Sequence, residues 1–282
     1  MLAEPVVVLG ASGMLGRAMR ETLVARGIRH AALTRAEVDL AALAGLSQSI
    51  PPGTGTVINC AAWTNVDAAE AHEEEAAKIN GHAVGELARH CRAIGAVLVH
   101  FSTDYVFDGR AQAPYTLDHP RAPLNAYGRS KALGEREIEA SGCQYLLIRT
   151  SWVYAPWGKN FVRTIVGLAK KRPTLRVVND QRGRPSSAEQ LARTSLALLG
   201  VGARGPYHAC DAGECTWFEF ARAAVAELGL ECVVEPCTSA EFPSPAVRPS
   251  YSVLDLSATV ARIGPLVAWR DSLRDVLARL EA

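Results

Sequence analysis

The stretch Pro5-Val-Val-Val-Leu-Gly10-Ala-Ser-Gly13-Met-Leu-Gly16 decides the fold of this chain. Its first residues, 5–9, form a continuous apolar run of the kind found in strands that are buried on both faces. The glycines then follow in a GxxGxxG pattern, and residues 14–26 have the apolar spacing of a helix. Such a turn lets backbone N–H groups approach a phosphate at the positive end of the helix. The stretch therefore predicts a nucleotide-binding turn, with an ordinary strand-to-helix turn as the alternative.

Short apolar runs continue to alternate with helical segments up to about residue 150. Strands are predicted at 31–34, 56–60, 96–102 and 145–148, and helices over the long stretch that ends at Arg92 and over 125–140. This alternation is typical of a parallel sheet covered by helices on both faces, and right-handed crossovers favour a doubly wound topology. We expect an α/β fold with a Rossmann-type parallel sheet, in which residues 1–150 form mainly a nucleotide-binding lobe.

The second half of the chain is less regular. Amphipathic helices are predicted at 216–228 and 270–281, and four prolines predict a surface loop over 236–249. We expect residues 151–282 to form mainly a smaller C-terminal lobe, with some segments returning to the first lobe. No repeat or low-complexity linker divides the chain, which indicates one cooperative unit.

The composition excludes several classes of protein. The 282 residues carry a net charge of +1 and are 49% hydrophobic and 21% charged, which excludes wholesale disorder and argues against a nucleic-acid partner. No run of 18 apolar residues predicts a membrane span, and Met1-Leu-Ala-Glu-Pro5 lacks the basic start of a signal peptide. We expect a cytoplasmic protein with reduced thiols. Two CxxxxC pairs (Cys210 with Cys215, Cys232 with Cys237) lack the spacing of a zinc knuckle, so no metal ligands are predicted.

Charge is unevenly distributed along the chain. Residues 67–75 hold five acidic residues, whereas residues 163–193 hold eight basic and two acidic residues. Solvated faces explain both segments in the simplest way. The alternative for the basic segment is a binding place for a phosphorylated ligand, with Arg182 and Arg184 as candidates.

The end of the second predicted strand bears on cofactor choice. An acidic residue there would bind the adenosine 2′-hydroxyl of NAD, whereas this chain has Thr34-Arg35. Arg35 can pair with the 2′-phosphate of NADP, or it is an ordinary solvated arginine. Asp39 and Leu40 follow at positions suited to adenine contacts.

A pair of residues on the predicted helix 125–140 carries candidate acid–base chemistry. Tyr127 and Lys131 are four residues apart and therefore share one helix face. A nearby lysine cation lowers the pKa of a phenol from about 10, which makes the tyrosine a usable proton donor. Thr103, at the end of a predicted strand, can hydrogen-bond a carbonyl oxygen and orient the tyrosine, although a strand-end cap is its simpler role.

These residues on a glycine-rich nucleotide fold resemble the extended short-chain dehydrogenase/reductase family. The chain further resembles the dTDP-4-dehydrorhamnose reductase family along nearly its whole length. The motifs that carry this resemblance are residues 59–70 (NCAAWTNVDAAE), 102–107 (STDYVF), 149–154 (RTSWVY), 179–183 (NDQRG), 205–208 (GPYH), 216–221 (TWFEFA) and 248–255 (RPSYSVLD).

The resemblance implies the reduction of the C4 keto group of dTDP-4-dehydro-L-rhamnose to dTDP-L-rhamnose by NADPH, or by NADH. It assigns proton donation to Tyr127, a tuning and ribose-binding role to Lys131, and assistance to Thr103. The implied cofactor contacts are Gly10, Ser12, Gly13, Met14, Leu15, Gly16, Arg35, Asp39, Leu40, Cys60, Ala61, Ala62, Thr64, Tyr127 and Lys131. The implied substrate contacts are Thr103, Asp104, Tyr105, Trp152, Asn160 and Arg248.

Some members of the family are described as dimers that share magnesium through acidic residues on two helices. The corresponding places here offer Ala18 on the first helix and Glu189 followed by Arg193 on the later one. This departure leaves both Mg²⁺ and a homodimer as open questions.

Three other functions remain as alternatives. The first is another sugar-nucleotide 4-ketoreductase with a different C4 stereochemistry or nucleotide carrier. The second is a dehydratase or epimerase of the same superfamily, which the absence of Glu after Thr103-Asp104 and the presence of Arg35 disfavour. The third is a non-catalytic regulatory protein similar to the beta subunit of methionine adenosyltransferase, which the intact Thr103, Tyr127 and Lys131 set disfavours.

Overall fold

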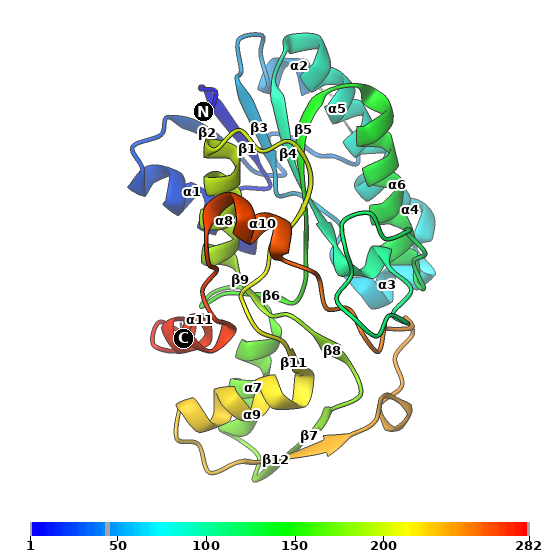
Figure 1. Ribbon diagram of the computed structural model, residues 1–282, viewed down its shortest axis with the longest axis vertical. Coiled ribbons are helices and arrows are strands. Elements are labelled where there is room, and N and C mark those ends of the chain that lie inside the picture. The colour runs from blue at the N-terminus through cyan, green and yellow to red at the C-terminus, as the bar shows by residue number, and fades with distance from the viewer. Residues whose placement is uncertain (1, 43–45, 281–282) are drawn as a thin grey trace.

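A six-stranded parallel sheet forms the centre of the molecule in a computed structural model that describes residues 2–42 and 46–280 (Figure 1). Its strands lie in the order β10-β5-β4-β3-β1-β2, and every pair is parallel. The bounds are β1 Val6–Leu9, β2 His30–Leu33, β3 Thr56–Asn59, β4 Val97–Thr103, β5 Gln144–Thr150 and β10 Gly205–His208. The prediction of a doubly wound α/β fold is confirmed.

The strand order reverses beside β1, because the chain crosses to β2 on one side and to β3 on the other. In open parallel sheets, the crevice for a ligand lies beyond the carboxyl ends of the strands at such a reversal. The loops after β1 and β3 therefore flank the expected binding place.

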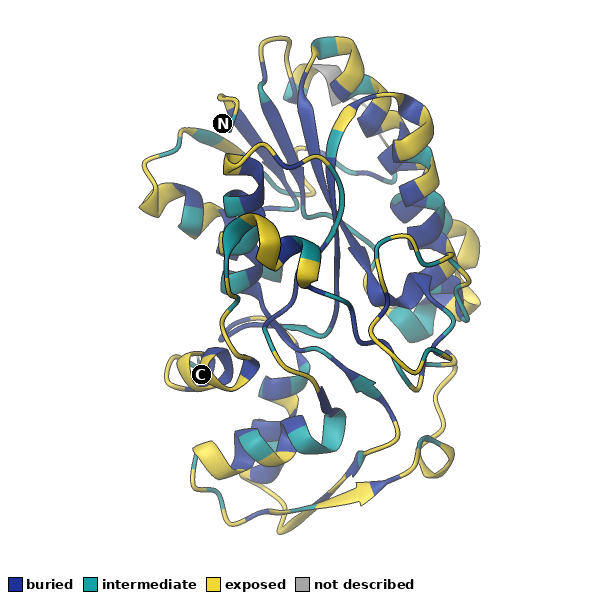
Figure 2. Cartoon of the chain, viewed as in Figure 1, coloured by how far each residue is buried: buried dark blue, intermediate teal, exposed yellow. Residues whose placement is uncertain are grey.

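Helices cover both faces of the sheet because side chains along each strand alternate between them. Val6 and Val8 of β1 join one apolar core with α1 (Met14–Ala25) and α8 (Ala188–Gly200). Val7 and Leu9 join a second core with α5 (Ala83–Ile94) and α6 (Ala126–Ser141). Figure 2 shows the resulting buried strands and the exposed outer faces of the helices. Burial on both faces is the physical reason for the continuous apolar run that opens the chain.

The long helical stretch predicted to end at Arg92 is divided into several helical segments, the last of which ends at Ile94. His72, with φ −134° and ψ 45°, separates α3 from α4, and a π-helical turn precedes α5. The bounds are α3 Val66–Ala71, α4 Glu73–Ala77 and the π-helical turn η1 Lys78–His82. The wider turn places Asn80 in the interior, where its amide bonds the Trp63 backbone and Ser130 Oγ. These bonds explain why the regular helical spacing is interrupted there.

The second half of the chain forms smaller elements below the sheet in Figure 1 and also contributes to the sheet itself. Strand β10 extends the sheet beside β5, and α8 packs on α1. The remaining strands are β6 Val153–Tyr154, β7 Thr174–Val178, β8 Arg182–Gly183, β9 Ser186–Ser187, β11 Cys215–Thr216 and β12 Val233–Cys237. The remaining helices are α2 Leu46–Ser49, α7 Phe161–Ala169, α9 Trp217–Glu227, α10 Ser257–Ile263 and α11 Trp269–Leu277, with short 3-10 turns at Asp104–Val106 and Ser239–Glu241.

The predicted loop over 236–249 begins inside a strand, which corrects the sequence interpretation. Pro236 lies in β12, which pairs with β7 in a two-stranded sheet. A proline that lacks the N–H donor is tolerated on such an edge strand. Residue 1 and the end of the predicted helix 270–281 lie outside the described residues. Within the described part of the chain, no helix has the length and apolar character needed to cross a membrane.

Candidate active site

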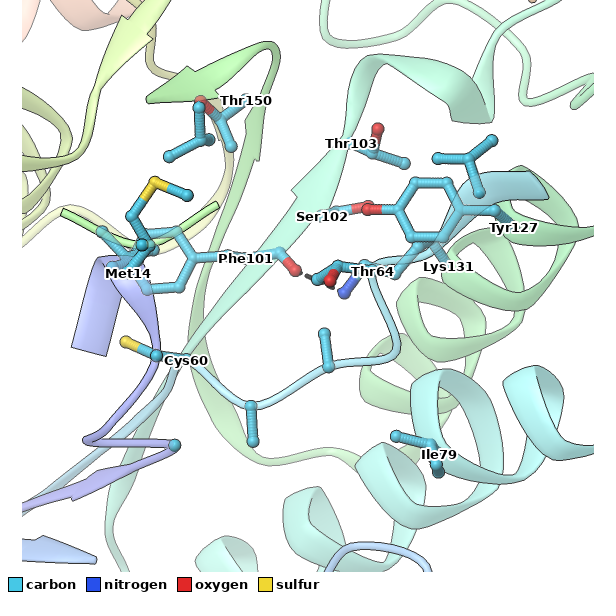
Figure 3. Close-up of a pocket in the computed structure, with 18 of the residues that line it drawn as sticks. Met14, Cys60, Thr64, Ile79, Phe101, Ser102, Thr103, Tyr127, Lys131 and Thr150 are labelled. Atoms are coloured by element: carbon cyan, nitrogen blue, oxygen red, sulfur yellow. Dashed lines mark hydrogen bonds between the residues drawn. The ribbon is translucent and has the colours of Figure 1, made fainter. Parts of the chain in front are cut away.

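A cavity of about 810 Å³ lies at the carboxyl ends of β1, β3, β4 and β5. Side chains from both halves of the chain line it, including Tyr127 and Lys131 from α6 and Trp152 and Trp217 from the second half. In Figure 3, Tyr127 and Lys131 extend from α6 toward Phe101, Ser102 and Thr103 at the end of β4. All of the residues predicted to bind cofactor or substrate line this cavity except Gly16 and Arg248.

Two glycines shape the turn after β1 through their missing side chains. Gly10 has φ +69°, and a Cβ there would lie 2.6 Å from the Ala61 nitrogen. A Cβ on Gly16 would lie 2.1 Å from the Gly10 carbonyl oxygen, so Gly16 allows α1 to approach the turn rather than lining the cavity. Gly13 is the N-cap of α1 and supplies no side-chain cap. The first N–H groups of α1 are therefore available to an anion in the cavity.

Arg35 lies at the cavity wall where the sequence placed a contact for a 2′-phosphate. Its side chain is 79% exposed, and its Nε lies 3.4 Å from Asp39 Oδ2. The pKa of Asp39 is lowered by the Ala41 backbone N–H and by Arg35. Cys60, Ala61, Ala62 and Thr64 follow β3 and form an opposite stretch of wall. Burial raises the pKa of the Cys60 thiol, so this thiol is neutral at physiological pH.

Tyr127 lies in the first turn of α6, whose start is held by Asn125. The Asn125 side chain accepts from the Gly128 N–H at 2.8 Å and donates to the Val247 carbonyl at 2.9 Å. Burial and the neighbouring Asp104 carboxylate raise the pKa of Tyr127, and a hydrogen bond with Thr103 opposes that rise. The predicted lowering of this pKa by Lys131 is not found, because the Lys131 ammonium bonds elsewhere in this structure.

Thr103 and Asp104 form a polar end to β4 beside Tyr127. Thr103 Oγ1 donates to Asp104 Oδ1 at 2.9 Å and accepts from the Tyr105 N–H at 3.1 Å. Asp104 is buried, and burial raises its pKa to about 7. Hydrogen bonds from Ser252 and Thr103 act in the opposite direction but are outweighed. Near neutral pH this carboxyl group is therefore partly protonated.

Lys131 lines the cavity and is almost fully buried. Its Nζ donates to the Phe101 carbonyl at 2.6 Å and lies 3.2 Å from His100 Nε2. Burial lowers the pKa of Lys131 to about 8, although the Glu135 carboxylate opposes the change. Sequence reasoning missed His100, although its position two residues after Leu98 on β4 places it on the face toward α6.

Aromatic side chains form the wall that the second half of the chain contributes. Trp152 stacks on Trp217 with ring centroids 3.6 Å apart, and both line the cavity. Trp152 has φ +50°, and a Cβ on Gly183 would lie 2.7 Å from its ring. The sequence predicted Trp152 but missed Trp217, which lies at the start of an amphipathic helix where a core role is the simpler explanation.

The other candidate substrate residues have structural partners. Asn160 lines the cavity, but its side chain caps α7 and donates to the Ala155 carbonyl at 2.9 Å. Arg248 lies outside the cavity lining and forms an ion pair with Asp67 at 2.9 Å. This ion pair connects the segment around Arg248, just before Tyr251, to Asp67 of α3.

The basic segment 163–193 does not supply the cations of the cavity wall. Arg184 donates to the Leu254 and Gly213 carbonyls at 2.8 and 2.7 Å, and Arg182 pairs with Glu214 at 3.5 Å. Neither arginine lines the cavity. The cationic residues among the described lining are Arg35, Lys131 and Lys159.

The positions considered for magnesium do not fit a metal site. Ala18 is buried and carries no ligand atom, and both carboxylate oxygens of Glu189 bond to Arg279. Among the residues that the structure describes, no three His, Cys, Asp or Glu side chains form a group suited to a metal ion.

Comparisons with known proteins converge on one family. The family described as RmlD substrate binding domain matches residues 4–282. A dTDP-4-dehydrorhamnose reductase from Streptomyces griseus is 40% identical and aligns with 95% of this chain and 91% of its own. A dTDP-4-keto-6-deoxy-D-glucose reductase from Streptomyces niveus is 38% identical and aligns with 98% of this chain and 97% of its own. The crystal structure of dTDP-4-dehydrorhamnose reductase from Bacillus anthracis in complex with NADP is 32% identical, covers 97% of this chain and 98% of that chain, and superposes with a TM-score of 0.93.

Proposed function

The chain belongs to the RmlD substrate binding domain family, and from this membership we propose that it reduces the C4 keto group of dTDP-4-dehydro-L-rhamnose to give dTDP-L-rhamnose, with NADPH as reductant. The observation that carries the proposal is the single cavity that contains the glycine turn, Thr103, Tyr127 and Lys131. A nucleotide turn and an acid–base pair on one cavity wall are what a hydride-transfer site requires.

The glycine turn, Arg35 and the loop after β3 would hold the cofactor. The free N–H groups at the start of α1 suit its pyrophosphate, and Arg35 suits a 2′-phosphate. The cofactor supplies a hydride to C4 when it is bound. NADH would lack the group that Arg35 is placed to bind, so the site favours NADPH.

Tyr127 would complete the reduction by giving its phenolic proton to the C4 oxygen. Its raised pKa keeps the phenol protonated at neutral pH, so that it serves as a donor. Thr103 Oγ1 lies on the same wall and can orient the carbonyl oxygen. Lys131 would stabilise the phenolate that remains and bind the cofactor ribose. Asp104, Tyr105, Trp152 and Asn160 are placed to contact the sugar nucleotide, whereas Arg248 would act through Tyr105 and Asp67.

The two halves of the chain would divide the two ligands between them. Residues 1–150 would bind mainly the nicotinamide cofactor, and residues 151–282 mainly the dTDP-sugar, with β10 and α8 returning to the first lobe. Neither nucleic acid nor a membrane is proposed as a partner. All seven cysteines are free, which suits a reducing cytoplasm. A homodimer would need contacts other than a magnesium bridge at Glu189.

A second candidate is reduction of a related dTDP-4-keto sugar. The relative from Streptomyces niveus is named for a different 4-keto substrate and is nearly as similar as the relative from Streptomyces griseus. The same cavity residues would serve both reactions, since each adds a hydride and a proton to a C4 keto group.

The test is turnover of dTDP-4-dehydro-L-rhamnose with NADPH and with NADH, followed by NMR of the product. We expect faster turnover with NADPH and the C4 configuration of rhamnose. Faster turnover of dTDP-4-keto-6-deoxy-D-glucose than of dTDP-4-dehydro-L-rhamnose would support the second candidate. A protein that binds NADPH without any turnover would instead support the non-catalytic alternative.

A further inference from the structure

A buried row of hydrogen bonds lies behind Lys131. Asn59 and His100 are direct partners in the register of β3 and β4, and both side chains face α6. Asn59 Nδ2 lies 3.1 Å from His100 Nδ1, and His100 Nε2 lies 3.2 Å from Lys131 Nζ. The three residues are 1 to 2% exposed. The row therefore connects two strands of the sheet to the catalytic helix.

The hydrogen-bond partners of Asn59 determine the tautomer of His100. The Ala61 N–H can only donate, and it lies 3.0 Å from Asn59 Oδ1, so that atom is the amide oxygen. The remaining amide N–H group faces His100 Nδ1, which must therefore accept. A neutral imidazole that accepts at Nδ1 carries its proton on Nε2. His100 thus directs an N–H group at Lys131.

We propose that His100, held in the Nε2–H tautomer by Asn59, is a positioning residue that fixes the place and the protonation state of Lys131. An Nε2–H donor stabilises the neutral amine of Lys131, which can accept, and disfavours the ammonium, which has no lone pair. The Phe101 carbonyl accepts from the same nitrogen in either state. The role of this row in catalysis rests on the proposed function, whereas its effect on Lys131 does not.

Other groups around Lys131 do not replace this effect. Glu135, one turn along α6, favours the ammonium but is engaged by Arg149 at 2.8 Å and Arg121 at 3.1 Å. On α3 and α4, Glu73 pairs with Arg129 and Glu70 accepts from the Ala126 N–H. On α5, Glu86 pairs with Arg89 at 2.8 Å. The remaining titratable groups of the elements that pack on α6 are Asp67, Glu74, Glu75, Lys78, His82, His90, Cys91, Arg92, Asp104 and Tyr105.

The consequence is a lysine that changes charge near neutral pH. Burial already lowers its pKa to about 8, and the His100 N–H acts in the same direction. The pKa of His100 itself is lowered well below its usual value by burial and by Lys131, so His100 stays neutral. The row ends at an amide N–H, which cannot accept a proton, and it therefore tunes Lys131 rather than conducting protons away.

The test is an NMR titration of the whole protein labelled at lysine ¹³Cε and histidine ¹⁵N. The chain has five lysines, Lys78, Lys131, Lys159, Lys170 and Lys171, and the Lys131 signal is identified by its loss in Lys131→Met. We expect Lys131 to titrate at pH 8 or below and His100 to show the Nε2–H tautomer. The variant His100→Asn keeps a polar group near the position of Nδ1, which faces Asn59, and loses the Nε2–H group that faces Lys131. In this variant the Lys131 midpoint should rise by about one pH unit or more.

Controls separate this effect from loosening of the core. His208→Asn changes another buried histidine, which bonds the Asp255 carbonyl, and should leave the Lys131 midpoint unchanged. If His100→Asn does not fold, Asn59→Asp offers an acceptor to His100 Nδ1, which should move its proton to Nδ1 and raise the Lys131 midpoint. An Nδ1–H tautomer in the unmodified protein, or an unchanged midpoint in these variants, would overturn the proposal.

The pH dependence of kcat distinguishes tuning of Lys131 from a merely structural role of His100, because a structural role would leave the pH dependence unchanged. With the dTDP-4-keto sugar, the basic limb of the kcat profile should move to higher pH in His100→Gln, which places an amide oxygen near Lys131. A lower kcat with an unmoved limb would also overturn the proposal. The NMR titration needs no substrate, so failure of the proposed reaction and failure of the His100 proposal remain distinguishable.

Discussion

Trp152 stacks on Trp217 with ring centroids 3.6 Å apart and ring planes 13° apart, although the Trp152 backbone has a left-handed φ of +50°. A tryptophan in this region of backbone space costs about 1–3 kcal/mol, which the surrounding packing must offset. The stack holds the Trp152 ring at the cavity wall, and Gly183 leaves the space that the ring occupies because it has no side chain.

Trp217→Ala should therefore weaken substrate binding more than cofactor binding. Loss of the stack removes about 0.5–1.5 kcal/mol beyond buried area and frees the Trp152 ring, so KM for the sugar nucleotide should rise about tenfold. Trp217→Phe keeps an aromatic partner and should remain within about threefold of the unmodified protein. Steady-state kinetics and NADPH titration measure the two effects. An equal loss for both ligands would argue against a sugar-side wall.

Arg35→Ala should reduce the preference for NADPH over NADH. A charge-assisted hydrogen bond is worth about 1.5–3 kcal/mol, so Kd for NADPH should rise about tenfold or more while Kd for NADH changes little. Fluorescence titration with each cofactor is the measurement. Arg26→Ala is the matched control, because Arg26 is an exposed arginine outside the cavity lining and its loss should not weaken NADPH binding. Parallel losses for both cofactors would exclude a 2′-phosphate contact.

Arg184→Gln should lower stability rather than ligand affinity. The sequence suggested a phosphate contact, but the guanidinium bonds two backbone carbonyls, at Leu254 and Gly213, outside the cavity lining. Leaving such acceptors unsatisfied costs about 1–3 kcal/mol. Urea unfolding should show this loss, with Kd for NADPH and for the dTDP-sugar nearly unchanged. A selective loss of dTDP-sugar binding would restore the original hypothesis of a substrate-side basic segment.

The buried Glu135–Arg149 pair should make stability depend on pH. Burial raises the pKa of Glu135, but the Arg149 hydrogen bonds and the Arg149 and Arg121 charges outweigh it, so the pKa is lowered. A lowered folded-state pKa adds stability above the unfolded value of 4.5, and this stability is lost as the pH falls through the folded value. Glu135→Gln should cost about 3–5 kcal/mol at pH 7, because Arg149 is left buried and unpaired.

Urea unfolding of both proteins at pH 7 and at pH 4 checks this expectation. The difference in the free energy of unfolding should shrink at the lower pH as the unmodified Glu135 becomes protonated. A difference that is equal at both values would mean that packing, not charge, sets the cost.

The sequence predicted the features that depend on local spacing. The run from Val6 to Gly16 determined the sheet and its nucleotide turn, because strand burial and glycine geometry are local properties. The pair Tyr127 and Lys131 followed from helical periodicity in the same way. These residues needed no knowledge of distant contacts.

Features that depend on distant packing were not predicted. Trp217 resembled a core residue until β8 and α9 brought it against Trp152. The π-helical turn accompanies the bonds of Asn80 to Trp63 and Ser130, and neither this turn nor the break at His72 is revealed by helical spacing. The suggested phosphate contacts of Arg182 and Arg184 did not follow from the structure, because the charge pattern does not indicate which group an arginine binds. Arg184 binds the Leu254 carbonyl and Arg182 pairs with Glu214.

The central claim is that Tyr127 is the proton donor of an NADPH-dependent 4-keto reduction. The most direct measurement compares Tyr127→Phe with the unmodified protein for turnover of dTDP-4-dehydro-L-rhamnose and for NADPH affinity. Since Phe retains the ring and removes only the hydroxyl, NADPH affinity should stay within about threefold while kcat falls by about 10²–10⁴. Undiminished turnover in Tyr127→Phe would contradict the account.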